Sequence, residues 1–70
     1  MHKRSLTISG HRTSIALEPE FWEGLEALAA HRGQRLTTLI EEIDAGRTTP
    51  NLSSALRVAV LRDIQRQLQP

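Results

Sequence analysis

The chain has 70 residues with a net charge of +1, an apolar content of 39%, one Trp, one Phe and no Cys. It therefore forms one small domain in which disulfides and thiolate metal sites are excluded and a single core is marginally stable. No apolar run approaches the roughly 18 to 20 residues of a membrane span, and residues 1–17 lack the apolar stretch of a signal peptide. We expect a cytoplasmic protein without a membrane partner.

A core this small needs a further source of stability. Because disulfides and thiolate metal sites are excluded, we expect the chain to be stabilised by pairing with a second copy. His2, His11 and His31 show no ligand spacing, so we expect no metal and no other cofactor. The charges are unevenly spread, because residues 1–17, 18–44 and 45–70 carry net charges of +3, −5 and +3. We interpret residues 1–10 as a basic N-terminal arm and residues 11–70 as the folded domain.

Residues 11–17 alternate with the period of a half-buried β-strand. One side of this strand carries Thr13, Ile15 and Leu17, and the other side carries Arg12, Ser14 and Ala16. Upstream, Leu6 and Ile8 form a second strand-like stretch with the opposite parity, so one regular strand cannot place all of these apolar residues on one face. Gly10 is therefore expected to be a bulge or a bend.

A lone strand at residues 11–17 leaves its backbone N–H and C=O groups without partners. Antiparallel pairing with the same strand of a second chain closes the ladder and turns Ile15 and Leu17 of both chains toward a shared core. The need to pair these backbone N–H and C=O groups therefore predicts a homodimer.

Three helices are predicted after the strand, at residues 19–32, 36–44 and 52–68. Pro19 suits the first position of a helix, Gly33 suits the end of one, and Asn51 is placed to cap the third. The fold class is therefore mainly α with one N-terminal β-strand.

The sequence resembles the ribbon-helix-helix superfamily of DNA-binding proteins. The resemblance is carried by Ser14-Ile15-Ala16-Leu17-Glu18-Pro19-Glu20-Phe21-Trp22 and by Leu25, Leu28, Ala29, Gly33, Leu36 and Ile40. A narrower group of short bacterial members is resembled by Lys3-Arg4-Ser5, Gly10-His11, Thr13-Ser14 and Asn51-Leu52-Ser53-Ser54-Ala55-Leu56-Arg57. The resemblance implies an intertwined homodimer with a two-stranded antiparallel ribbon, to which the helix at 52–68 is an addition. The expected dimer core is Ile15, Leu17, Phe21, Trp22, Leu25, Leu28, Leu36, Leu39, Ile40, Ile43, Leu56 and Val60.

Such ribbons lie in the major groove, so the resemblance implies base contacts by Arg12, Ser14 and Ala16. The family also binds a phosphate at the N-terminus of its second helix. The expected phosphate contacts are Lys3, Arg4, Arg35, Leu36, Thr37 and Thr38. If the helix at 52–68 is instead the family's second helix, the anchor moves to Asn51, Leu52 and Ser53.

The resemblance implies a homodimeric transcriptional regulator whose partner is double-stranded DNA, with higher assemblies through the helix at 52–68 as a further option. One alternative is an interaction module that keeps the fold and binds another protein. A second alternative is an antitoxin-type autoregulator, although residues 68–70 are too few to occupy a toxin. No catalytic constellation is present, so we do not expect an enzyme.

Overall fold

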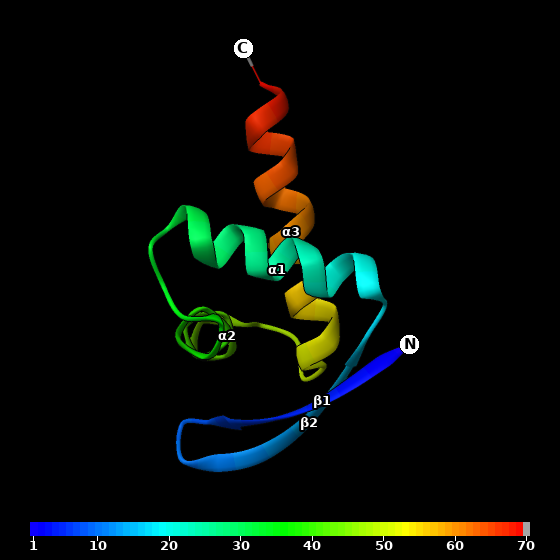
Figure 1. The fold of residues 1–70 in the computed structure, drawn as a ribbon, viewed down its shortest axis with the longest axis vertical. Helices are drawn as coiled ribbons and strands as arrows, with labels where there is room; N and C mark the ends of the chain where they lie inside the picture. Colours follow the sequence, from blue (N-terminus) through cyan, green and yellow to red (C-terminus); the bar gives the residue numbers. More distant parts are fainter. Residues whose placement is uncertain (70) are drawn as a thin grey trace.

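The computed structural model describes residues 1–69 and contains a two-stranded antiparallel sheet followed by three helices (Figure 1). The elements are β1 (His2–Ile8), β2 (His11–Leu17), α1 (Pro19–His31), α2 (Leu36–Gly46) and α3 (Leu52–Leu68). The sheet lies along one side of the molecule, and all three helices stand on the same face of it. The predicted fold class, a β-ribbon followed by helices, is confirmed.

A tight turn at Ser9 and Gly10 joins the two strands. Both residues have positive φ, 51° and 82°, the conformation of a two-residue type I′ hairpin turn. The strands pair in register from Ile8 opposite His11 to His2 opposite Leu17. The backbone N–H of Ser9 donates to a carboxylate oxygen of Glu41 at 2.8 Å, which ties the turn to α2.

The hairpin corrects two expectations drawn from the sequence. Residues 2–8 are not a separate basic arm, and the strand at 11–17 is not the only strand of its chain, because β1 pairs with one of its edges. The reversal at Gly10 turns Leu6 and Ile8 toward the side that holds Ile15 and Leu17, which explains the change of parity. The N–H and C=O groups along this edge of β2 therefore find partners within the chain.

The ends of the helices follow local capping chemistry, and their bounds agree with the predicted ranges to within two residues. α1 ends at a left-handed Gly33, where the N–H of Gln34 donates to the carbonyl of Ala29 at 2.8 Å. This pattern is a Schellman motif, which needs positive φ after the last turn. At α3, the side chain of Asn51 accepts from the N–H of Ser54, as predicted for a helix cap.

The core lies between the inner face of the sheet and the helices. Each residue of the expected dimer core is buried or partly buried within one chain, and Ile8 and Ala29 join them. α1 and α3 approach most closely at Gly24, where an added Cβ atom would lie 2.6 Å from a methyl carbon of Val60. The chain therefore closes a hydrophobic core without a partner.

An ion pair connects the start of α1 to α3. Arg57 Nε donates to Glu18 Oε1 at 3.0 Å, and the same guanidinium lies 5.9 Å from the ring centre of Phe21. The pKa of the Glu18 carboxyl is lowered, first by a hydrogen bond from its own backbone N–H and then by the hydrogen bond from Arg57. Both contacts favour the charged form.

The C-terminal half of α3 extends beyond α1 and away from the sheet (Figure 1). Four apolar side chains on this helix stay solvent-exposed: Val58 (41%), Leu61 (51%), Ile64 (47%) and Leu68 (79%). Helical spacing puts Ile64 and Leu68 on the same side of α3 as Leu56, but the buried residues of this helix are Leu56 and Val60. We call Val58, Leu61, Ile64 and Leu68 the α3 stripe.

Candidate nucleic-acid interface

The sheet presents a polar face on the side opposite the core. Successive side chains of a strand point to opposite faces, so the observed register places the same set from both strands on this side. The set is Lys3, Ser5 and Thr7 of β1 with Arg12, Ser14 and Ala16 of β2. All are exposed except Ala16, which is partly buried. We call these six residues the outer face.

Hydroxyl groups link the two strands across the outer face. The Oγ atoms of Ser5 and Ser14 lie 3.2 Å apart, and Arg12 Nη1 donates to Thr7 Oγ1 at 3.5 Å. Residues 1–17 contain no acidic side chain, so Lys3 and Arg12 give the outer face a positive charge. A positive face with exposed hydroxyl groups is suited to the phosphates and base edges of DNA.

Arg4 lies on the inner side of the ribbon and is already engaged. Its Nη1 donates to Glu26 Oε1 at 2.8 Å, and its guanidinium stands 4.5 Å from the ring centre of Trp22. Trp22 in turn donates from Nε1 to the carbonyl of His2 at 2.9 Å. These contacts fasten β1 to α1, and an expected phosphate contact by Arg4 does not fit this placement.

The N-terminus of α2 has no side-chain cap. Arg35 occupies the N-cap position in an extended conformation and makes no capping hydrogen bond. The first N–H groups of a helix have no partner within it, so those of residues 36–38 remain free to meet an anion. Arg35 and Thr38 are exposed and Leu36 and Thr37 are partly buried.

The N-terminus of α3, the alternative phosphate anchor, is occupied by its own chain. Asn51 caps the N–H of Ser54 at 3.1 Å, and the Ser53 hydroxyl donates to the carbonyl of Ala16 at 3.4 Å. Residues 50–53 also face residues 13–15 of β2 across a shallow recess. The geometry thus favours α2 over α3 as a phosphate site.

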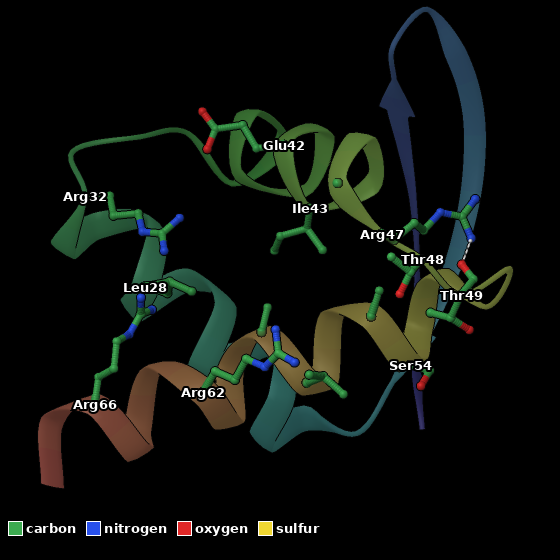
Figure 2. A pocket seen from close by; sticks show the side chains of 14 residues that line it. Leu28, Arg32, Glu42, Ile43, Arg47, Thr48, Thr49, Ser54, Arg62 and Arg66 are labelled. Carbon is green, nitrogen blue, oxygen red and sulfur yellow. Dashed lines mark hydrogen bonds between the residues drawn. The ribbon is translucent and has the colours of Figure 1, made fainter. Parts of the chain in front are cut away.

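A groove opens between the three helices, lined by no residue of the ribbon (Figure 2). Its floor is apolar and includes Leu28 and Ile43, while Arg32, Arg62 and Arg66 stand around its rim. Its volume is about 700 Å³. Within residues 1–69, Arg32 and Arg62 form no salt bridge, so the rim has positive charge available for an acidic partner.

Sequence reasoning named the β2 half of the outer face and Lys3 of β1, but not the other two residues of the β1 half. Ser5 and Thr7 were not among the expected contacts, although they lie directly opposite Ser14 and Arg12. The signal was present in the opposite parities of residues 6–8 and 13–17 around Gly10. Two strands with opposite parity joined by a two-residue turn are typical of a hairpin with a single apolar face.

Across residues 1–69, no three His, Asp or Glu side chains gather closely enough to hold a metal ion. The helices of this part of the chain also include none that is long and apolar enough to cross a membrane. The surfaces described above are a positive ribbon, an uncapped N-terminus of α2 and an arginine-rimmed groove.

Comparison with known proteins gives one match. A family model described as a ribbon-helix-helix domain matches residues 1–64. The matched span includes both strands, α1, α2 and most of α3. No curated protein and no solved structure matches the chain.

Proposed function

The chain belongs to the ribbon-helix-helix family, and from this premise we propose that it is a sequence-specific DNA-binding transcriptional regulator. Ribbon-helix-helix domains are generally DNA-binding regulators. The observation that carries the proposal is the outer face, which combines Lys3 and Arg12 with exposed hydroxyls and no acid. A regulator of this kind acts on DNA in the bacterial cytoplasm.

In this function the outer face enters the major groove, which admits a two-stranded ribbon. Arg12 donates two hydrogen bonds to a guanine edge, Ser14 donates to or accepts from a neighbouring base, and Ala16 contacts a thymine methyl group. The hydroxyl of Thr7 supports this role, because its contact with Arg12 directs the guanidinium along the outer face.

Phosphate contacts fix the ribbon in the groove. We assign them to Lys3 and to the N-terminus of α2, where Arg35 adds charge beside the free N–H groups of Leu36, Thr37 and Thr38. Removing the Lys3 side chain should reduce, by about one, the slope of the logarithm of the DNA-binding constant against the logarithm of the salt concentration.

The α3 stripe supports a homodimer. Leu61, Ile64 and Leu68 follow one another at intervals of three and four residues, the spacing of a helix–helix seam. Between Leu61 and Leu68, the neutral Gln65 and Gln67 stand beside the stripe by helical spacing. The charged residues Arg62, Asp63 and Arg66 lie farther from its line. We propose that two chains pair through this stripe.

Binding of random duplexes at two salt concentrations tests the DNA-binding function. The protein should enrich a specific motif in a salt-dependent way, and Arg12→Ala should lose about 1 to 3 kcal/mol of binding to it, roughly 5- to 150-fold. Arg32→Ala, which removes the same charge at the end of α1, is the matched control and should bind normally. Equal losses for the two variants would point to nonspecific charge rather than reading by the ribbon.

The groove in Figure 2 favours a second candidate function, a protein-interaction module. An amphipathic helix with acidic flanks suits an apolar floor between Leu28 and Ile43 with arginines at the rim. Absence of duplex binding even at low salt would reject the regulator and leave this module as the function.

A further inference from the structure

The groove between the three helices has two chemically different ends. Arg32 and Arg66 stand toward one end and Thr48 and Thr49 toward the other, with Arg62 between them (Figure 2). The volume of about 700 Å³ falls within the range of small-molecule sites, roughly 300 to 1,000 Å³. We propose that the groove binds a linear amphipathic carboxylate, with its head group at the arginines and its apolar chain along the floor. This inference goes beyond the DNA-binding function and does not depend on it.

One face of α3 supplies both the apolar part and the charged part of the groove. Ala55, Ala59, Arg62 and Arg66 line it at successive spacings of four, three and four residues, so they share one face of the helix. The two alanines are partly buried, and their short side chains leave space above the floor. The two arginines follow them along the same face. An apolar chain that lies over the alanines therefore brings its end to the arginines.

The positive charge of the groove is available to a ligand. Within residues 1–69, Arg32 and Arg62 form no salt bridge. Glu42, the acidic residue of the lining, already accepts a hydrogen bond from the side chain of Gln34 at 2.7 Å. A guanidinium group pairs with a carboxylate through two parallel hydrogen bonds. The charge of the lining is therefore complementary to a carboxylate head group.

The narrow shape of the groove favours an extended chain over a helix as the occupant. From Ser54 to Arg66 the groove follows α3 for about 18 Å. Its volume spread over this length gives a mean cross-section of about 40 Å², against about 80 Å² for a helix 10 Å across. A helix would reach the floor with its side chains only. A carboxylate of eight carbons extends roughly 10 Å, which is about the rise of α3 from Ala55 to Arg62.

The groove is separate from the other two surfaces proposed for this protein. No residue of the ribbon lines it, so a ligand in the groove leaves the outer face free. From Leu61 onward, the α3 stripe lies on the side of the helix opposite Ala55 and Ala59, by helical spacing. A dimer through the stripe therefore leaves the groove open.

Titration with octanoate in the absence of DNA tests the site. Octanoate should bind saturably at one site per chain, and 1-octanol and butyrate should each bind at least about 10-fold more weakly, because head group and chain both contribute. In methyl NMR spectra, the signals of Leu28 and Ile43 should move during the titration, while those of Ile8 and Ile15 stay in place. Absence of saturable binding at millimolar octanoate, or equal binding of butyrate, would overturn the inference.

Variants of α3 separate the contributions of the chain and the head group. Ala59→Leu fills the space above the floor and should weaken octanoate binding by at least about 10-fold. Ala27→Leu, the matched control at an exposed position of α1, should bind octanoate normally. Arg62→Gln should weaken binding of octanoate by about 10-fold and leave that of 1-octanol unchanged. Equal losses for Ala59→Leu and Ala27→Leu would contradict binding in the groove. If Ala59→Leu lowers the Tm, Arg62→Gln and the NMR signals still decide.

A helical peptide distinguishes a small ligand from a protein partner. The probe is an amphipathic peptide of about four turns with leucines along one face and glutamates at one end. Octanoate should compete with any binding of this peptide in the groove. Binding of the peptide without binding of octanoate would reject the inference and assign the groove to a protein partner. Because these titrations contain no DNA, their outcome is independent of whether the DNA-binding function holds.

Discussion

Gly24 is the residue at which packing of the helices is least tolerant of change. A methyl group there would meet Val60, whose side chain is buried and β-branched and cannot easily rotate away. Ala has a higher helix propensity than Gly by about 1 kcal/mol, but overpacking a core costs about 1 to 3 kcal/mol. The clash should therefore outweigh the gain in helix propensity.

We predict that Gly24→Ala lowers the free energy of unfolding in urea by about 1 to 2 kcal/mol. Adding Val60→Ala makes room for the new methyl group, so the double variant should be more stable than the two single effects predict. Gly46→Ala, at a helical glycine with no atom within 4 Å of the added Cβ, should not destabilise the protein. Additive effects of Gly24→Ala and Val60→Ala would mean that the two helices are not in close contact at this point.

At the scale of the elements, the turn at Ser9 and Gly10 determines whether the ribbon forms. Type I′ turns prefer Asn followed by Gly, because both residues have positive φ. Ser9→Asn should stabilise the protein by up to about 1 kcal/mol, because Asn tolerates the left-handed region of φ better than Ser does. The backbone N–H of residue 9 would still donate its hydrogen bond to the Glu41 carboxylate.

Gly10→Ala provides the opposite test of the same turn. Ala at a φ of +82° should cost about 1 to 2 kcal/mol, although its methyl group would meet no neighbour. Thermal melts of both variants measure the effect. A loss of stability in Ser9→Asn comparable to that in Gly10→Ala would argue against a type I′ turn.

The elements also show how far sequence reasoning extends. Periodicity predicted β2 and all three helices, because each has an apolar side repeated at a regular spacing. It did not predict the hairpin, because Ser9-Gly10 is a weaker turn signal than Asn-Gly and β1 was considered apart from β2. The position of Arg4 depends on Trp22 and Glu26, which are distant in sequence and lie beyond local patterns.

For the whole molecule, one chain contains both a buried hydrophobic core and a two-stranded hairpin. Helical spacing shows which residues of α3 share a side, but it does not show that α3 crosses α1 and continues past it (Figure 1). Leu61, Ile64 and Leu68 are exposed, so they are available for the contact between chains proposed above.

A dimer through the α3 stripe presents two ribbons, and it therefore requires two half-sites, about 10 base pairs apart or a multiple of that distance. We predict that Leu61→Glu/Ile64→Glu weakens dimerisation by at least about 100-fold, because charged groups in an apolar interface are costly to bury. The fold should persist, since Leu56 and Val60 fill the core from the other side of α3.

Light scattering after size-exclusion chromatography measures the change in dimerisation. Ala27→Glu/Ala30→Glu adds the same charges to exposed positions of α1 and should leave the dimer intact. A wild-type protein that stays monomeric at concentrations of hundreds of micromolar would reject the α3 interface. It would leave the pairing of β1 with β2 unaffected, because both strands belong to one chain. The selected motif should then contain one half-site instead of two.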